Sequence, residues 1–410
     1  CARSPRHDLY DQRARQPSPV QTSDLLNRPA RPRIFVSCGE PSGDLYAGAL
    51  ARQLSILAPS CEIVGRGGSE FQRGGGHLLA DYRGLAVTGF TELVSKVPAL
   101  SAAKRRLVAA AALDRPDALV VIDYFGFNVR LARDIKRLGV PVVYYVSPQI
   151  WAWRPGRMKA IRAIADRVLV IFPFEEAIYR DAGVPVEFVG HPLIDLVDTA
   201  VSRAAFLGQL GLDPNQPTVA LLPGSRTSEL RRILPTLIAA AERIRQRVPG
   251  AQFVIARASH LDDRLFEPAH RLHGIHIVEG QTDAVIASSD LVLTASGTAT
   301  VQTALHDKPM VVVYRVSAFE YRIARPFVRL DTFAMVNLIA GERLVPELIQ
   351  DAFTPEAVAS EAVSLLTDPQ RVARIREGLA GVRRKLGGPG ASRRAAEAVL
   401  KIAERTCEPS

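Results

Sequence analysis

The chain has 410 residues, of which 47% are hydrophobic and 23% charged, a composition typical of a folded globular protein with room for two domains. Its formal net charge of +10 favours an anionic partner, whether nucleic acid, an anionic membrane face or a phosphorylated substrate. No apolar run approaches the roughly 18 residues that span a bilayer, so we expect only peripheral membrane contact. The cysteines show no paired metal-ligand spacing and predict reduced thiols in a cytoplasmic protein: Cys1, Cys38, Cys61 and Cys407.

Residues 1–31 are rich in Arg, Pro, Ser and Gln and show no hydrophobic periodicity. This composition predicts a flexible leader outside the fold. Because the sequence does not begin with Met, we expect either a piece of a longer protein or a true start near Arg31.

From Arg33 onward, short Val- and Ile-rich runs alternate with longer Ala-, Arg- and Leu-rich segments of helical period. This alternation predicts βαβ units, and therefore an α/β fold with parallel sheets. The predicted strands of the first half are Ile34–Ser37, Glu62–Gly65, Ala118–Ile122, Val142–Val146 and Arg167–Ile171. Those of the second half are Val219–Leu222, Gln252–Ala256, Ile275–Val278, Leu291–Thr294 and Met310–Tyr314.

A cluster of Pro, Asn and Gly before Val219 marks a hinge between the two series of strands. We therefore expect two Rossmann-like domains, residues 32–195 and 196–385, whose parallel sheets face a cleft. Residues 386–410 read as a C-terminal helix that must dock to bury its apolar side chains.

The stretch "VSCGEPSGDL" leaves the first predicted strand through Glu40, Ser42, Gly43 and Asp44. Such a turn lies at the carboxyl end of a parallel strand, where open α/β sheets bind ligands. The alternative is an ordinary turn in which Ser42 or Asp44 caps the following helix.

The second half carries "LLPGSRTSEL", in which Gly224, Ser225 and Arg226 follow a predicted strand. Backbone N–H groups of this turn and the forked guanidinium suit phosphate oxygens, and Glu229 is a candidate helix cap. The alternative is an Arg on a solvated helix start.

A second turn of this kind, "TASGTATVQTAL", places Ser296, Gly297 and Thr298 at the start of a helix, where hydroxyls and the helix dipole favour an anion. Two anion sites in one half suggest a diphosphate. The alternative is that these residues only cap the helix.

In "VVIDYFGFN", Asp123 ends an apolar strand and is our candidate general base, since a carboxylate beside a cleft can take a proton from a hydroxyl. The alternative is that Asp123 braces a loop, and Asn128 is open to the same two interpretations. The two tryptophans of "YYVSPQIWAWRPGRMKAI", Trp151 and Trp153, either line a ligand site or fill a core.

The segment "LAVTGFTELVSKVPALSAAKRRLVAAA" combines apolar residues with a basic cluster. This combination suits an anionic membrane surface, and the candidate contact residues are Phe90, Leu93, Lys104, Arg105 and Arg106. The alternative is a solvated basic face beside core residues. No D-x-D metal signature or G-x-x-x-x-G-K-[ST] phosphate loop occurs in the sequence, so we expect no metal and no cofactor.

In combination, "CGEPSGDLYAGAL", "FPFEEAIY", "VGHPLID", "LLPGSRTSEL", "SGTAT" and "KPMVVVYRVSAFEYRIA" resemble the lipid-A-disaccharide synthases in order and spacing, from about Ile34 to the C-terminal helix. The resemblance implies a GT-B-like glycosyltransferase at the cytoplasmic face of the inner membrane. It would join UDP-2,3-diacylglucosamine to 2,3-diacylglucosamine 1-phosphate with inversion, giving UDP and a β(1→6) disaccharide 1-phosphate. It also implies dimers that exchange residues 386–410.

By position, Asp123 matches a carboxylate of the family, Arg226 matches its "LPGSR" arginine, and Ser296, Gly297 and Thr298 match its nucleotide-side turn. Glu40 and Asp44 are the substitute bases. The resemblance also places Gln302 and Asn337 on the nucleotide-sugar side. The chain departs from the family at three positions: Gly126 stands for a usual Asp, Gln302 for a usual Glu, and Val336 for a usual Pro.

The closest alternative function is a UDP-N-acetylglucosamine epimerase or another GT-B enzyme, because "GHP" and "SGT" occur there too. A basic membrane- or nucleic-acid-binding protein without catalysis is a different class, and we expect no nucleic-acid partner. An NAD-dependent oxidoreductase ranks last, because no convincing fingerprint follows a strand.

Overall fold

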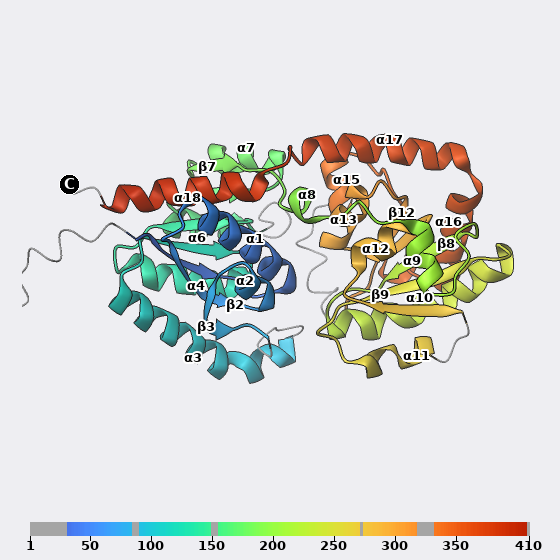
Figure 1. The fold of residues 1–410 in the computed structure, drawn as a ribbon, viewed down its shortest axis with the longest axis horizontal. Coiled ribbons are helices and arrows are strands. Elements are labelled where there is room, and N and C mark those ends of the chain that lie inside the picture. The colour runs from blue at the N-terminus through green and yellow to red at the C-terminus, as the bar shows by residue number, and fades with distance from the viewer. Residues whose placement is uncertain (1–30, 84–89, 149–154, 271–273, 318–331, 408–410) are drawn as a thin grey trace, which may run out of the picture. The chain divides into compact units, whose positions relative to one another are not determined.

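The computed structural model describes residues 31–83, 90–148, 155–270, 274–317 and 332–407. In this part of the chain two parallel sheets form, one of seven and one of six strands, and helices pack on them (Figure 1). The predicted α/β fold with two Rossmann-like sheets is confirmed. Apart from Arg31, the predicted leader lies outside the described residues, as do Trp151 and Trp153.

The first sheet has the strand order β3-β2-β1-β4-β5-β6-β7. Its strands are β1 (Arg33–Ser37), β2 (Glu62–Gly67), β3 (His77–Asp81), β4 (Ala118–Ile122), β5 (Val142–Tyr145), β6 (Arg167–Val170) and β7 (Val186–Phe188). The helices of this half are α1 (Pro41–Leu57), α2 (Ser69–Arg73), α3 (Phe90–Asp114), α4 (Phe125–Lys136), α6 (Pro155–Ile164), α7 (Pro173–Asp181) and α8 (Leu193–Leu196).

The second sheet has the order β10-β9-β8-β11-β12-β13. Its strands are β8 (Thr218–Leu222), β9 (Gln252–Arg257), β10 (Ile275–Glu279), β11 (Leu291–Ala295), β12 (Met310–Tyr314) and β13 (Glu347–Ile349). The helices are α9 (Arg203–Gln209), α10 (Thr227–Arg247), α11 (Glu267–His270), α12 (Thr282–Ala287), α13 (Thr298–Leu305), α15 (Met335–Ala340), α16 (Pro355–Thr367), α17 (Pro369–Lys385) and α18 (Ala391–Cys407), with short 3-10 helices η2 (Asp263–Phe266) and η4 (Gln350–Ala352).

Every predicted strand is present, with ends shifted by no more than two residues. Strands β3, β7 and β13 were not predicted. Each lies at an edge of its sheet, is only partly buried, and therefore lacks the continuous apolar run of the central strands.

Both sheets change direction at their first strand. In the first sheet β4 pairs with the free side of β1, and in the second β11 pairs with the free side of β8. Ligands bind at such switch points, beyond the carboxyl ends of the strands. The four motifs singled out from the sequence follow these four strands, so the fold brings them to two switch points.

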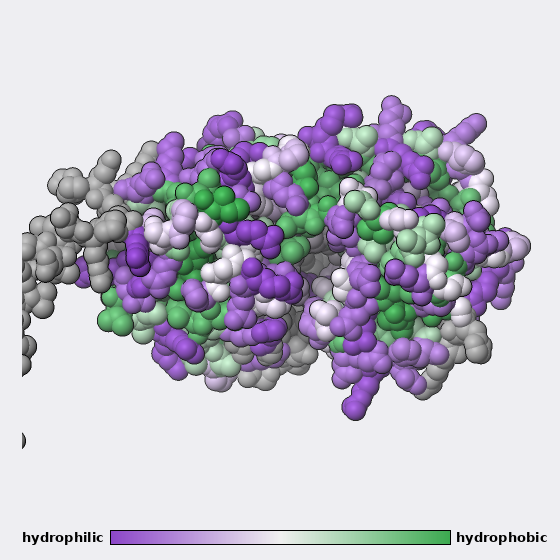
Figure 2. All heavy atoms as spheres, in the orientation of Figure 1, coloured by the Kyte–Doolittle hydropathy of each residue, from purple (hydrophilic) through white to green (hydrophobic). Residues whose placement is uncertain are grey.

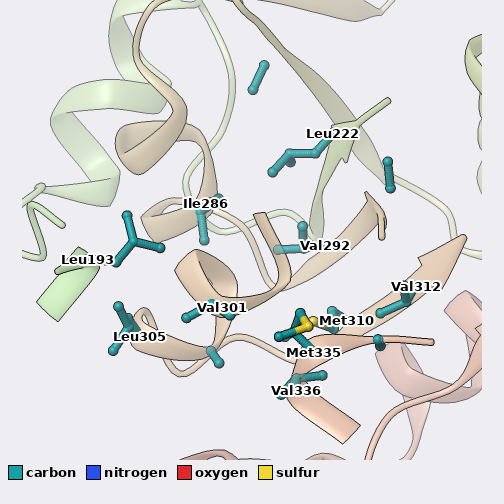
Figure 3. Packing of buried hydrophobic residues seen from close by; sticks show 14 of the residues in the cluster. Leu193, Leu222, Ile286, Val292, Val301, Leu305, Met310, Val312, Met335 and Val336 are labelled. Carbon is teal, nitrogen blue, oxygen red and sulfur yellow. The ribbon is translucent and has the colours of Figure 1, made fainter. Parts of the chain in front are cut away.

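The core is built from strands that are buried on both faces, as in β4 and β11, where every residue is buried. Figure 3 shows part of it, with Met310 of β12 and Met335 of α15 in the same buried cluster as Val292 and Val301. Outside, hydrophilic residues cover most of the face in Figure 2, with smaller hydrophobic patches between them.

The last helix returns to the first half of the chain and packs along α1 (Figure 1). Its start is fixed by Asp195, whose carboxylate accepts hydrogen bonds from the N–H groups of Gly390 (2.6 Å) and Ser392 (3.0 Å). The guanidinium of Arg394 donates to the carbonyl of Val189 at 2.9 Å. The "VGHPLID" segment therefore anchors the C-terminus, while exchange of residues 386–410 between two copies stays a prediction.

Candidate active site

A cavity of about 1090 Å³ is lined by the turns at both switch points. The lining includes Glu40 and Ser42 after β1, residues 123–127 after β4, residues 224–226 after β8, and residues 296–299 after β11. The structure thus brings together four motifs that are far apart in the sequence.

The turn after β1 needs a glycine because an aromatic ring occupies the side-chain position. A Cβ on Gly39 would lie 2.3 Å from Cδ1 of Tyr124. Glu40 follows this glycine and lines the cavity, whereas Asp44 does not.

Asp44 is nearly fully buried, and its carboxylate accepts hydrogen bonds from the N–H groups of Gly68 (2.6 Å), Glu70 (3.0 Å) and Phe71 (3.1 Å). It therefore caps α2. Neither the substitute-base role nor the capping of its own helix matches this placement, because the carboxylate points to the neighbouring loop.

The turn after β4 places Asp123 in an unusual backbone conformation. Asp123 and Tyr124 both have φ = 45°, in the left-handed region, which costs of order 1–3 kcal/mol per residue. The amide of Asn128 donates to the carbonyls of Asp123 (2.8 Å) and Ile122 (3.0 Å), and its oxygen accepts from the Ser37 hydroxyl (2.8 Å). Asn128 therefore braces the turn that presents Asp123 to the cavity.

The charge state of Asp123 is set by burial and by three charged neighbours. Burial raises its pKa to about 7, and repulsion from Glu40 acts in the same direction. A backbone hydrogen bond at Tyr124 and the cations Arg226 and Arg157 oppose that rise. A carboxylate with a pKa near 7 suits proton transfer at neutral pH.

Arg226 links the two switch points by an ion pair with Glu40. Its other Nη atom contacts Glu229 at 3.1 Å. Arg226 thus offsets the carboxylate that has the largest charge effect on Asp123.

The turn after β8 is closed by Glu229. Gly224 has φ = 114°, and a Cβ there would lie 2.4 Å from Oε2 of Glu229. That carboxylate accepts from the N–H groups of Ser225 (3.1 Å) and Arg226 (3.3 Å). The expected capping by Glu229 is confirmed, and the two N–H groups expected to face an anion point to Glu229 instead.

The turn after β11 starts α13 at the cavity wall. The Ser296 hydroxyl donates to the carbonyl of Phe333 at 3.2 Å, and Gly297 adopts φ = 147°. A side-chain hydrogen bond joins Thr298 to Tyr46 of α1. The first turn of α13 holds no acidic residue, so its dipole stays available to an anion in the cavity.

Gln302, one turn further along α13, is oriented by an acidic side chain. Its Nε2 donates to Oδ1 of Asp283 at 2.8 Å, and Nε2 of His306 lies 2.8 Å from the same oxygen. Burial raises the pKa of Asp283, but the hydrogen bonds from His306 and Gln302 outweigh it and lower that pKa overall. The ionised carboxylate of Asp283 thus accepts a hydrogen bond from the amide nitrogen of Gln302. Oε1 of Gln302 is left to accept a hydrogen bond from a ligand.

Asn337 does not reach the cavity. It is fully buried, its Nδ2 donates to the Val345 carbonyl (3.0 Å) and to Glu347 (2.6 Å), and its Oδ1 accepts from the Val345 N–H (2.9 Å). The predicted nucleotide-sugar contact does not match this placement, because the amide is used to join α15 to β13.

His191 lines the cavity although the sequence analysis did not select it. Burial lowers its pKa to about 3, so the ring is neutral. The N–H of Leu193 donates to Nδ1 at 3.2 Å, which leaves the ring proton on Nε2. In the sequence, only the "GHP" motif, which other GT-B enzymes share, could have indicated that the His191 ring donates a hydrogen bond in the cavity.

The predicted membrane segment forms α3. Lys104 lines the cavity and pairs with Asp134 at 2.6 Å, whereas Arg105 and Arg106 are exposed and lie outside the cavity. Phe90 and Leu93 belong to α3, but their side chains lie outside the described residues.

In the described ranges, no helix is long and apolar enough to cross a bilayer. The same residues include no group of three or more His, Cys, Asp or Glu that could hold a metal ion.

Comparison with known proteins identifies the family. The family model for lipid-A-disaccharide synthetase matches residues 34–402. The chain belongs to the lipid-A-disaccharide synthase family. A lipid-A-disaccharide synthase from Syntrophus aciditrophicus is 40% identical over 376 residues, which cover 91% of this chain and 98% of that protein. The family resemblance inferred from the motifs is confirmed.

As a member of the lipid-A-disaccharide synthase family, the protein is a glycosyltransferase of lipid A biosynthesis. Its fold is shared more widely. A UDP-GlcNAc 2-epimerase from Neisseria meningitidis, solved bound to UDP-GlcNAc, has a TM-score of 0.60 at 13% identity and covers 90% of this chain and 99% of its own. A calicheamicin glycosyltransferase has a TM-score of 0.58 at 15% identity, and the match covers 93% of this chain and 100% of that protein.

We predict opposite pH shifts from the two charges beside Asp123. Glu40→Gln removes a repelling carboxylate, so the pH midpoint of kcat/KM should fall by roughly one unit. Arg226→Ala removes a cation and leaves Glu40 unpaired, so the midpoint should rise by a similar amount. Midpoints from pH–rate profiles check this, and shifts in the same direction would contradict it.

A second prediction concerns the departure at Gln302. Gln302→Glu places a carboxylate against the ionised Asp283, so the affinity for UDP at pH 7 should fall by about tenfold, or ~1.4 kcal/mol. In the double variant Asp283→Asn/Gln302→Glu, the new amide can donate to the introduced carboxylate, so most of the affinity should return. Titration calorimetry measures both, and equal loss in the single and double variants would show that Asp283 does not set this preference.

Proposed function

We propose that the protein transfers a 2,3-diacylglucosaminyl group from its UDP derivative to the 6-hydroxyl of 2,3-diacylglucosamine 1-phosphate. The products are UDP and the acylated β(1→6) disaccharide 1-phosphate. Family membership supports this reaction, and the UDP-GlcNAc bound by the epimerase of the same fold supports a UDP-sugar as the donor. In this proposal residues 32–195 bind the acceptor and residues 196–385 bind the donor.

The observation that carries the proposal is the position of Asp123. This carboxyl lines the cavity with a pKa near 7, and Arg226 on the second sheet reaches across to Glu40 beside it. A base that can both accept and release a proton at neutral pH thus lies next to a cation suited to a diphosphate.

The proposed step is a single displacement with inversion. The acceptor hydroxyl oxygen forms a bond to the anomeric carbon as the bond from that carbon to the UDP oxygen breaks, and the electron pair leaves with UDP. Asp123 takes the hydroxyl proton, and Glu40 is the substitute base. Arg226 and the Ser296–Thr298 helix start stabilise the negative charge on the leaving diphosphate, where preorganised donors have their largest effect.

An epimerase remains the alternative reaction for this fold. Incubation with UDP-N-acetylglucosamine alone discriminates the two, since an epimerase needs no acceptor. The direct test combines the purified protein with both acylated sugars and detects UDP and the disaccharide by mass spectrometry. Formation of a UDP-sugar epimer, or no disaccharide, would refute the proposed transfer.

Because both proposed substrates carry acyl chains, we also propose that the enzyme works at the anionic cytoplasmic face of the inner membrane. Helix α3 supports this proposal, since it carries the exposed apolar Leu113 two turns from the exposed Arg106, with the exposed Arg105 next to it. Apolar side chains beside cations are the composition of a peripheral membrane contact.

We predict that Asp123→Asn lowers turnover by roughly 100-fold or more, the scale of general-base loss, without weakening UDP binding. The same change should stabilise the fold at high pH. The folded pKa near 7 lies above the unfolded value of about 3.9, so ionisation of Asp123 destabilises the native state as the pH rises through that window.

Melting temperatures of the Asn variant should therefore exceed those of the parent at pH 8, and the difference should shrink toward pH 5. Near-normal turnover, or a difference independent of pH, would remove Asp123 from the role of general base.

For the membrane contact we predict that Arg105→Glu/Arg106→Glu releases the protein from anionic vesicles, because each basic residue near such a surface contributes about 1 kcal/mol. Lys104 is left unchanged, since it lines the cavity. The matched control is Arg374→Glu/Arg376→Glu on α17, which reverses two exposed charges of the second half. Vesicle cosedimentation that falls equally in both variants would point to net charge rather than to α3.

A further inference from the structure

The cavity contains a second cationic region, on the side of the first sheet. We call it the basic lobe and define it by the side chains of Lys104, Arg130 and Arg157, all of which line the cavity. They come from three helices, of which α4 packs against both α3 and α6. No sequence motif groups them, and of the three only Arg157 has a part in the site described above, through its effect on the charge of Asp123.

Local contacts hold these cations around the start of α4. The guanidinium carbon of Arg157 lies 4.9 Å from the ring centre of Phe125. The next residue, Gly126, is exposed, and a Cβ there would meet no atom within 4 Å. Arg130 follows Gly126 by four residues and therefore lies on the same face of the helix. Gly126 therefore leaves open space on the face of α4 that carries Arg130.

Lys104 closes this region on the side of α3. Its Nζ contacts Asp134, which lies one turn beyond Arg130 on α4, at 2.6 Å. Arg130 is exposed, and Arg157 is partly buried. A fork-shaped guanidinium in such a place can bind two oxygens of one phosphate.

The wall beside the cations is apolar. Val97 and Leu100 of α3 and Phe125 of α4 line the same part of the cavity, and Val97 is 47% exposed. A ligand that fits these surroundings carries an anionic group and hydrocarbon together.

Asp123 lines the same cavity as both cationic regions, and Arg226 from the second half and Arg157 from the basic lobe both act on its charge. At about 1090 Å³ the cavity has room for two substrates at once beside this base.

We propose that the basic lobe binds the phosphate monoester of the acylated sugar acceptor and thereby directs its hydroxyl toward Asp123. This inference rests on the proposed function, because it assigns one of the two substrates to a place in the same cavity. A phospholipid headgroup offers the same phosphate chemistry, so the test must separate the two sources.

The first experiment compares Arg130→Ala and Arg157→Ala with the parent protein. Each should raise KM for the acceptor by about tenfold, the scale of one charged hydrogen bond, with KM for the donor and the affinity for UDP within twofold of the parent. The matched control is Arg133→Ala, an exposed arginine of α4 outside the cavity lining. Equal changes for donor and acceptor would overturn the proposal.

An acceptor without its phosphate gives a sharper readout. The parent should prefer the phosphorylated acceptor, and in the double variant Arg130→Ala/Arg157→Ala the ratio of the two rates should fall toward unity, although the loss of Arg157 also raises the pKa of Asp123 and changes the rate with either acceptor. This result also shows that the variant is folded. A preference retained in the double variant would place the phosphate elsewhere.

The assay medium distinguishes the two possible sources of the phosphate, the acceptor and a phospholipid headgroup. The acceptor defect should be the same in neutral detergent micelles and in anionic vesicles. A defect seen only with anionic vesicles would mean that the basic lobe holds lipid headgroups, which overturns the proposal.

A binding experiment separates failure of this inference from failure of the proposed function. Glucosamine 1-phosphate with short acyl chains is titrated into the parent and the double variant. Binding that depends on Arg130 and Arg157 in a protein without transferase activity would keep the phosphate site and reject the reaction. Active transfer with binding unchanged in the double variant would reject the site and keep the reaction.

Discussion

The order of strands in two parallel sheets is the constraint on which the site depends. Each sheet adds its later strands on the opposite side of its first strand, so the turns after β1 and β4, and after β8 and β11, diverge and leave space at the carboxyl ends. Glu40 and Arg226, 186 residues apart in sequence, form an ion pair because each follows the first strand of its sheet. The order in which the chain connects the strands therefore determines which side chains meet in the cavity.

Within that frame, a few polar contacts determine what Asp123 can do. Asn128 compensates for two left-handed residues by binding their carbonyls and the preceding strand ends, so the carboxyl is held where burial raises its pKa. Arg226 then offsets the repulsion from Glu40. A neutral-pH base results from a balance of burial and two cations rather than from one interaction, so single substitutions around it change its pKa in predictable directions.

The sequence predicted the central strands and the turns that follow them, because a buried parallel strand is a continuous apolar run and its turn carries Gly, Ser or Asp. The edge strands β3, β7 and β13 have no such run. Asp44 and Asn337 lie in motifs that suggested ligand contacts, but the direction of a side chain depends on backbone groups of distant segments, and both bind those groups instead. Arg130 lies in no motif, and Arg157 lies in the tryptophan motif without being singled out, since their shared place in the cavity arises only when α3, α4 and α6 pack.

The return of α18 to the first half has a consequence for synthesis of the protein. Leu50 and Leu54 of α1 belong to the same buried cluster as Ala395, Ala396 and Val399, which are made after both sheets. A nascent chain that has reached only the second sheet therefore still exposes an apolar face of α1. Loss of α18 would uncover the apolar face of α1 in the first half and leave the packing of the second sheet unchanged.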